Sequence, residues 1–209
     1  MKIWLSDAGK RFNRDWIFRH LSYSFVAGRT YAIVGPNGSG KSTLLQLLSG
    51  ALAPSEGQVG WNISDTEVQA DSVFEKIAIC APYLEVIEEM SVTEFLRFHA
   101  QFKPLINGYS TDRILDIIGL QAAAHKQIRY YSSGMKQRVK LAQSFFSDTP
   151  ILLLDEPCTN LDESGYQLYY QLLKDLCKDR LVIICSNEEK ELAMCEERID
   201  ILQFKSINE

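Results

Sequence analysis

Short apolar runs separated by more polar, helical patterns organise most of the chain. The runs Tyr31–Val34, Ile77–Cys80, Ile151–Leu154 and Leu181–Cys185 are rich in apolar residues and are bounded by turn or charged residues. Strands that are covered on both faces of a parallel sheet have this pattern. Since helical patterns fall between the runs, we expect an α/β fold with a mainly parallel sheet.

The N-terminal region follows a different rule. Leu21, Tyr23 and Phe25 alternate with Ser22 and Ser24, so one face of this segment is apolar and the other is polar. This period of two is typical of a strand with one face on the core and one face in solvent. We therefore expect the N-terminal strands to form an antiparallel edge of the fold.

A long, mostly helical stretch lies between the runs at 77 and 151. Ser91 and Glu94 have the spacing of a capping box, and a second helical pattern around 114–118 stops at Gly119. We expect an inserted helical lobe at approximately 85–147. Because no internal repeat or flexible linker interrupts the chain, we treat residues 1–209 as one domain.

Composition and charge argue against a nucleic-acid-binding protein, a membrane-spanning protein and a disulfide or metal framework. The 209 residues carry a formal net charge of -5, so the chain has no overall basic field, and we expect no nucleic-acid partner. No apolar run is long enough to span a bilayer, so a membrane role is expected to be peripheral, through a partner. The 5 cysteines and the scattered histidines (His20, His99 and His125) match no disulfide or metal spacing.

The run that ends at Val34 leads directly into a P-loop pattern, G-x-x-x-x-G-K-[ST]. A helical Leu44–Leu48 segment follows it, as the motif requires. Glycines let the backbone N–H groups face phosphate, Lys41 can reach the terminal phosphates, and the Ser42 hydroxyl can bind Mg²⁺. We therefore predict that ATP and Mg²⁺ bind to the residues of this motif, which are Gly35, Pro36, Asn37, Gly38, Ser39, Gly40, Lys41, Ser42 and Thr43.

A second motif follows the apolar run Ile151–Leu154. Asp155 and Glu156 are adjacent carboxylates at the end of a buried strand. Acidic residues at such a position normally have a functional or structural role. With a P-loop in the chain, Asp155 is expected to help hold Mg²⁺ with Ser42, and Glu156 is expected to polarise the water that attacks the γ-phosphate.

Taken together, the motifs resemble the ATP-binding-cassette ATPases over nearly the whole chain. Tyr131–Arg138 stands where that family has its signature segment, and Asp155–Pro157 followed by Thr159–Asp162 resembles its Walker B motif and D-loop. The resemblance implies a P-loop NTPase fold of the cassette type and an ATPase subunit of a transporter.

The resemblance also implies how the sites are completed. Family members form a head-to-tail dimer in which the signature of one subunit closes over ATP held by the other. Ser132, Ser133 and Gly134 would then meet the γ-phosphate across the dimer, and Asp162 would join the catalytic set through the D-loop. A second copy of the chain is the simplest partner, and a heterodimer is the alternative.

An aromatic residue upstream of the P-loop stacks on adenine in this family. Phe12 has a similar place in this sequence, and Trp16 competes with it for the role. An ordinary core position near a strand end is the other interpretation of Phe12.

Two switch positions depart from the family pattern, and the signature segment carries Ser133 and Met135 where glycine and glutamine are usual. Ala81–Pro82–Tyr83 stands where a glutamine is usual, and Asn187 stands where a histidine usually faces the γ-phosphate. An asparagine can donate a hydrogen bond but cannot carry a proton as histidine does. Hydrolysis is therefore expected to be slowed rather than lost.

Two functions remain open at this point. The first is an ATPase subunit on the cytoplasmic face of the cell membrane that drives a separate transmembrane permease, with coupling near Tyr83–Phe102. The signature segment is similar to those of exporter-type cassettes, which favours export. The second is a nucleotide switch or assembly factor of the cytosol that hydrolyses ATP weakly.

Overall fold

The computed structural model describes residues 1–64 and 66–205. The strands form two sheets: an antiparallel sheet in the order β2-β1-β4-β5 and a parallel sheet in the order β6-β7-β8-β3-β9. In chain order the elements are β1 (Lys2–Phe12), β2 (Asp15–Val26), β3 (Thr30–Val34), α1 (Lys41–Leu48), β4 (Glu56–Ile63), β5 (Thr66–Val68), β6 (Ile77–Cys80), α2 (Val92–His99), α3 (Thr111–Ile117), α4 (Ser133–Phe145), β7 (Ile151–Asp155), α5 (Glu163–Leu176), β8 (Leu181–Cys185) and β9 (Glu197–Asp200).

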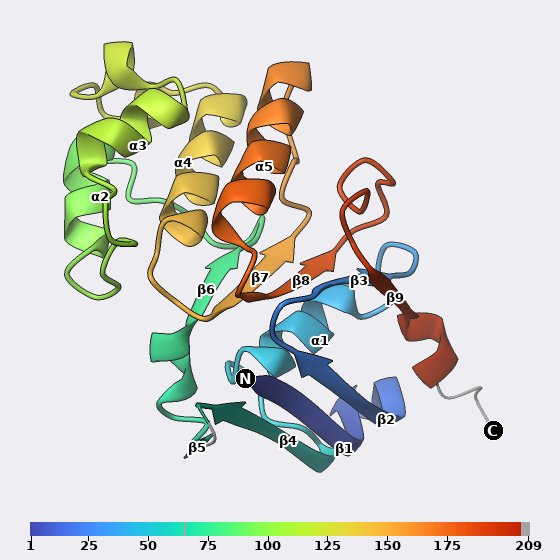
Figure 1. Ribbon diagram of the computed structural model, residues 1–209. Coiled ribbons are helices and arrows are strands. Elements are labelled where there is room, and N and C mark those ends of the chain that lie inside the picture. Colours follow the sequence, from blue (N-terminus) through green and yellow to red (C-terminus); the bar gives the residue numbers. More distant parts are fainter. Residues whose placement is uncertain (65, 206–209) are drawn as a thin grey trace.

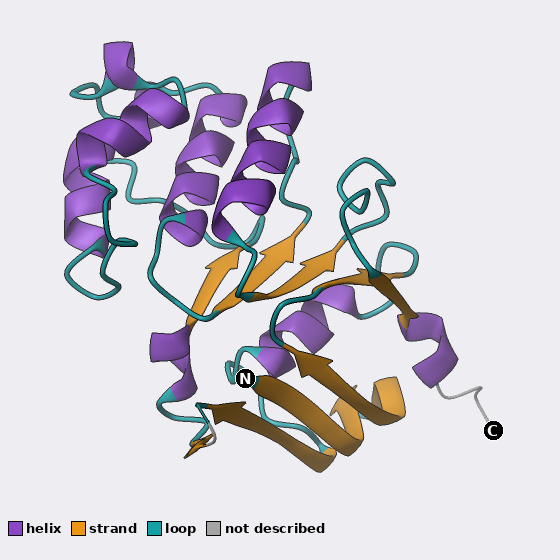
Figure 2. Cartoon of the chain, in the orientation of Figure 1, coloured by secondary structure: helices purple, strands orange, loops and turns teal. Residues whose placement is uncertain are grey.

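The elements are arranged in layers (Figure 1). Helix α1 lies between the two sheets, and helices α4 and α5 cover the opposite face of the parallel sheet. Helices α2 and α3 pack beyond α4, away from the antiparallel sheet. Figure 2 shows that this outer part is made of helices and loops, whereas the strands gather on the other side of the molecule. The α/β cassette fold expected from the sequence is confirmed.

The strands of the parallel sheet are buried on both faces. Along β7, Ile151 and Leu153 pack toward α1, while Leu152 and Leu154 pack toward the α4 and α5 side. All of these side chains are fully buried. A strand with two covered faces needs apolar residues at every position, which explains the continuous apolar runs of the sequence.

The N-terminal strands run antiparallel as expected, but they form a sheet of their own instead of an edge of the parallel one. Ile3 pairs with Phe25 on one side and with Trp61 on the other. The buried side chains of these strands share a core with the leucines of α1. Because one face of this sheet must cover α1, it stacks on the helix and cannot extend the parallel sheet at its edge.

The predicted helix boundaries are confirmed at two positions. At the start of α2, the Ser91 hydroxyl accepts a hydrogen bond from the Glu94 N–H, and the Glu94 carboxylate accepts one from the Ser91 N–H, at 3.3 and 2.8 Å. Helix α3 ends at Ile117, and Gly119 follows with φ of +68°. Left-handed glycine is a common helix terminator because it has no Cβ.

The carboxyl ends of three central strands define one edge of the parallel sheet. Ile33 of β3 pairs with Cys185 of β8, and Asp155 of β7 pairs with the same residue. The loops that follow these strands therefore leave the sheet side by side. In open α/β sheets this edge is where ligands bind.

Candidate functional site

The P-loop curls between β3 and the start of α1. Gly40, the N-cap residue of α1, has φ of +108°, and a Cβ added there would lie 2.3 Å from Cγ2 of Ile17. No side chain caps this helix. The first N–H groups of α1 are therefore free to meet an anion, and the helix dipole favours negative charge at the same place.

Lys41 lies at the centre of this loop and is only 6% exposed. Its Nζ donates to the main-chain oxygen of Gly35 at 2.7 Å, and it lies 3.3 Å from both the oxygen of Pro36 and Oδ1 of Asn187. The charge is thus held against the loop by the chain's own acceptors. A phosphate that enters the loop can exchange these neutral partners for a charge-assisted bond.

The loop encloses a cavity that suits a phosphate chain. Ser39 is 1% exposed, and its hydroxyl has no hydrogen-bond partner in the described part of the chain. A buried hydroxyl without a partner costs free energy, so a ligand oxygen is a natural complement. The cavity has a volume of about 280 Å³, and its lining residues are Ile17, Asn37, Gly38, Ser39, Gly40, Lys41, Ser42, Thr43 and Glu156.

A cation at this site would depend on few protein oxygens. Asp155 is 3% exposed at the end of β7. Burial raises the pKa of its carboxyl, while a hydrogen bond with Ser42 and the charge of Lys41 lower it. Residues 1–64 and 66–205 contain no group of three or more His, Cys, Asp or Glu able to hold a metal. One hydroxyl and one carboxylate fit Mg²⁺ that is bound mainly through substrate phosphates and water.

Glu156 occupies the next position and also lines the P-loop cavity. Its backbone has φ of +45°, which is unusual for a residue with a side chain. Two contacts hold this conformation: the Glu156 N–H donates to the oxygen of Cys185 at 2.9 Å, and the Thr159 hydroxyl donates to the Glu156 oxygen at 2.9 Å. The strained turn aims the carboxylate away from the strand and toward the P-loop.

Asn187 lies directly beside the P-loop. Its Nδ2 donates to Oδ1 of Asn37 at 2.8 Å, and its Oδ1 faces Lys41. The residue that stands in place of the family's histidine is therefore in the predicted neighbourhood. Its part in hydrolysis stays a prediction.

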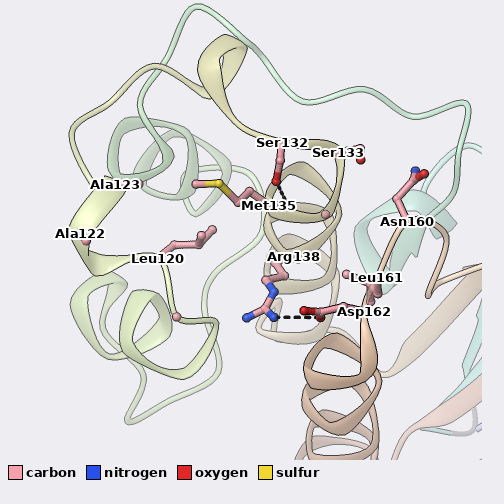
Figure 3. A pocket seen from close by; sticks show the side chains of 12 residues that line it. Leu120, Ala122, Ala123, Ser132, Ser133, Met135, Arg138, Asn160, Leu161 and Asp162 are labelled. Carbon is pink, nitrogen blue, oxygen red and sulfur yellow. Dashed lines mark hydrogen bonds and ion pairs between the residues drawn. The ribbon is translucent and has the colours of Figure 1, made fainter.

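The signature segment forms a second, separate cavity of about 490 Å³ (Figure 3). Ser132 is the N-cap of α4, and its hydroxyl accepts from the Met135 N–H at 3.3 Å. Below it, Arg138 donates to the Ser164 hydroxyl at 2.6 Å and lies 3.5 Å from Oδ1 of Asp162. The lining also includes Gly119, Leu120, Ala122, Ala123, Ser133, Gly134, Asn160 and Leu161.

The two cavities share no lining residue within the described part of the chain. Glu156 faces one of them, while Asn160 and Asp162, a few residues later, face the other. One chain therefore presents its phosphate loop and its signature at different places. The segment 156–162 connects them.

The predicted adenine contact is not part of the P-loop cavity. Phe12 is 47% exposed, and Lys10 lies over its ring at 5.4 Å. The Trp16 ring faces Arg11 and Arg19 at 5.4 and 4.3 Å. The stacking roles of both aromatic residues stay predictions.

Sequence reasoning missed Ile17, whose side chain lines the P-loop cavity. It follows Trp16 on β2, so the alternation of a strand could have pointed to it only if the pairing with the P-loop were already known.

A P-loop, a strand that ends in Asp155 and Glu156, and a signature helix on a two-sheet α/β framework define an ATP-binding cassette. The family model described as "ABC transporter" matches residues 18–159. The chain belongs to the ABC transporter family, and it is an ATP-binding subunit of an ABC transporter and an ABC ATPase.

Two relatives with ATP-binding transport names are similar to this chain. The cytochrome c biogenesis ATP-binding export protein CcmA of Rhodopseudomonas palustris is 32% identical over 206 residues, which cover 94% of this chain and 98% of that protein. The taurine import ATP-binding protein TauB of Roseobacter denitrificans is 31% identical over 190 residues, which cover 87% of this chain and 68% of that protein.

Solved structures show the same fold. A putative ABC transporter ATP-binding protein from Pyrococcus furiosus superposes with a TM-score of 0.83 at 24% identity, covering 99% of this chain and 100% of that one. The dimeric cassette MJ0796 gives a TM-score of 0.80 at 22% identity, covering 95% of this chain and 94% of that one. No helix within residues 1–64 and 66–205 is both long and apolar enough to cross a membrane.

Proposed function

We propose that this subunit hydrolyses ATP with Mg²⁺ at a site built from the P-loop and the end of β7, and that residues 1–209 act as one nucleotide-binding domain. Lys41 and the N–H groups at the start of α1 bind and orient the phosphates. Ser42 and Asp155 would hold Mg²⁺, which supplies charge neutralisation at the phosphate oxygens when bound. Glu156 accepts the proton of the attacking water.

Turnover is slowed by two replacements. Asn187 donates a hydrogen bond at the place of a histidine, but it cannot take up a proton. Pro82 has no side-chain donor or acceptor at the place of a glutamine. Loss of one transition-state contact costs about 10²- to 10³-fold in rate. The presence of Glu156 at the P-loop cavity supports slow hydrolysis over none.

The separation of the two cavities is the observation that carries the proposed mechanism. Since Ser132, Ser133 and Gly134 do not line the P-loop cavity of their own chain, a second molecule would bring a signature to each ATP. ABC cassettes dimerise and act with permeases. A homodimer in which the signature segment of each chain faces the P-loop of the other is the simplest assembly.

The second partner is a transmembrane permease, reached from the cytoplasmic face of the membrane. An exposed apolar stretch after β6 fits such a contact: Tyr83 and Leu84 are 45% and 42% exposed, and Phe102 at the end of the α2 segment is 69% exposed. The named relatives include an export and an import protein, so the proposal includes no direction of transport.

Phosphate release by purified protein with ATP and Mg²⁺ tests the proposal. The rate is expected to rise more than linearly with protein concentration, because the active species is a dimer. Lys41→Ala is expected to weaken ATP binding by about 10- to 150-fold, the value of one charged hydrogen bond. Glu156→Gln is expected to bind ATP normally and to lose at least about 10²-fold in turnover.

A nucleotide switch is the competing function, and the replacements at Pro82 and Asn187 favour it. Under this alternative the wild-type protein binds ATP and dimerises, and its release of phosphate is too weak to depend on Glu156. Glu156→Gln would then match the wild type in every measurement. Turnover in the wild type that is lost in Glu156→Gln would exclude the switch.

A further inference from the structure

Glu191 is a buried carboxyl that has no role in the proposed mechanism of hydrolysis. It is 2% exposed and lies in the turn segment that follows Asn187. Its side chain lines a cavity of about 360 Å³ together with Glu156 and Asn187. A buried carboxyl is costly unless its contacts compensate, so its presence beside two site residues needs an explanation.

The two oxygens of Glu191 have different surroundings. Oε1 accepts a hydrogen bond from the Cys158 N–H at 2.7 Å. Oε2 is buried and has no hydrogen-bond partner in the described part of the chain. Burial raises the pKa of this carboxyl, hydrogen bonds with Ser186 and with the Cys158 N–H lower it, and the nearby charges of Glu156 and Glu188 raise it further.

The contact with Cys158 reaches the turn that carries Glu156. This turn starts in a left-handed conformation at Glu156 and continues to Asn160, which has φ of +65°. Such a backbone persists when surrounding contacts hold it. The Glu191 carboxylate is a side chain from outside the turn that binds one of its main-chain groups, two residues after Glu156.

Two main-chain oxygens of the segment that carries Glu191 accept hydrogen bonds from side chains of α5. The Tyr169 hydroxyl donates to the main-chain oxygen of Glu191 at 2.9 Å, and the Tyr170 hydroxyl donates to the oxygen of Lys190 at 2.7 Å. Helix α5 therefore anchors this segment directly. The carboxylate is left to act on the neighbouring turn.

At its other end the same segment reaches the P-loop, because Asn187 contacts both Lys41 and Asn37. We propose that Glu191 is a positioning residue for hydrolysis, which ties the Glu156 turn to the Asn187 segment through the Cys158 N–H so that Glu156 and Asn187 face the phosphates together. This inference rests on the proposed hydrolytic function.

Three variants and three measurements test the inference. Glu191→Ala removes the acceptor, Glu191→Gln keeps an acceptor oxygen without the charge, and Glu189→Ala is the matched control in the same segment, where the carboxylate pairs only with Arg198 at the surface among the contacts of the described residues. Steady-state phosphate release gives kcat and KM, and urea unfolding and ATP binding are measured on the same samples.

We expect kcat of Glu191→Ala to fall about 10- to 100-fold, the usual cost of losing an outer positioning contact, with KM and ATP affinity within about twofold of the wild type. Glu191→Gln recovers most of the lost kcat, and Glu189→Ala matches the wild type. The differences in kcat are measured without urea, at a temperature at which the unfolding curves show every variant to be folded.

Other outcomes overturn the inference in distinguishable ways. If the wild type turns over and Glu191→Ala keeps its kcat, the positioning role is wrong while the proposed function stands. If ATP affinity and unfolding free energy fall together with kcat and Glu191→Gln recovers none of them, Glu191 serves only folding. If the wild type itself does not turn over, the proposed function fails and takes this inference with it.

Discussion

The two halves of the nucleotide site are built in opposite ways. In the P-loop half, Ser39, Lys41 and Asp155 are buried, and Lys41 is held by a hydrogen bond to a main-chain oxygen of its own loop. In the signature half, Ser132 and Ser133 are exposed at the start of α4. The P-loop half is therefore preorganised by the fold, while the signature half is a surface offered to another molecule.

The supports of the two halves differ accordingly. The P-loop turns at glycines with positive φ, and Ile17 of β2 packs against it at Gly40. The signature is supported from behind, where Arg138 joins the oxygen of Ile118, the Ser164 hydroxyl and Asp162. Changes in the first half should weaken ATP binding, whereas changes in the second should lower turnover and leave the ATP affinity of the isolated chain unchanged.

The largest separation is expected from Ser132→Ala. Both Ser132 and Ser91 are helix N-caps whose hydroxyls accept a main-chain N–H, so Ser91→Ala is a matched control. Each change should lower the free energy of unfolding by about 1 kcal/mol. Phosphate release should fall about 10²- to 10³-fold in Ser132→Ala alone, because in the proposed dimer the Ser132 hydroxyl would meet the γ-phosphate of the other chain's ATP.

ATP affinity of isolated Ser132→Ala chains should equal that of the wild type, since the P-loop is untouched. Equal loss of phosphate release in the Ser91→Ala control would show that helix stability, and not phosphate contact, limits turnover.

A smaller effect is expected from Gly40→Ala in the P-loop half. The alanine would have to adopt the left-handed backbone conformation of Gly40, and its Cβ would lie 2.3 Å from Cγ2 of Ile17. We expect a loss of about 2–3 kcal/mol in unfolding free energy, measured by urea titration, together with weaker ATP binding. Gly28→Ala is the control: φ is +75° but nothing lies within 4 Å of the added atom, so a loss of about 1–2 kcal/mol is expected.

Equal losses in Gly40→Ala and Gly28→Ala would mean that Ile17 moves aside at little cost. The packing of Ile17 against the P-loop would then be easily rearranged. The P-loop half would be less preorganised, relative to the signature half, than its contacts indicate.

The smallest effect concerns pH on the signature side. Burial, with a contribution from Lys103, lowers the pKa of His99 on α2 to about 4. In the unfolded chain this residue titrates near pH 6.5, so between these values the unfolded state binds the extra proton. The free energy of unfolding should therefore decrease as the pH falls from about 6.5 toward 4.

His99→Gln should reduce this acid sensitivity, because an amide can still meet the Ser147 hydroxyl that His99 contacts at 2.9 Å but does not titrate. Urea titrations of both proteins at pH 7 and pH 5 measure the difference. An unchanged pH dependence in the variant would assign the effect to other groups.

Local motifs made much of the fold and site predictable. The spacing of the P-loop, the apolar run before Asp155 and the capping box at Ser91 act within a few residues, and each predicts a local conformation that the structure contains. Apolar runs without alternation likewise indicated strands with two covered faces, because burial on both faces removes the need for polar positions.

Relations between distant segments were not predictable in the same way. The antiparallel strands could have extended the main sheet, and only packing against α1 decided that they stack on it. Ile17 and Glu191 carry no motif, and their places beside the P-loop and Cys158 depend on contacts with residues 23 or more positions away.

The amino-acid sequence by itself determined the class of fold, the phosphate loop and the carboxylates at the end of β7, because these features follow from short-range periodicity and spacing. Tertiary structure decided which residues surround each motif. It placed the signature away from the P-loop of its own chain and brought Glu191 to the turn of Glu156. Such placements depend on how elements pack across the sheet, and no local pattern of residues encodes that packing.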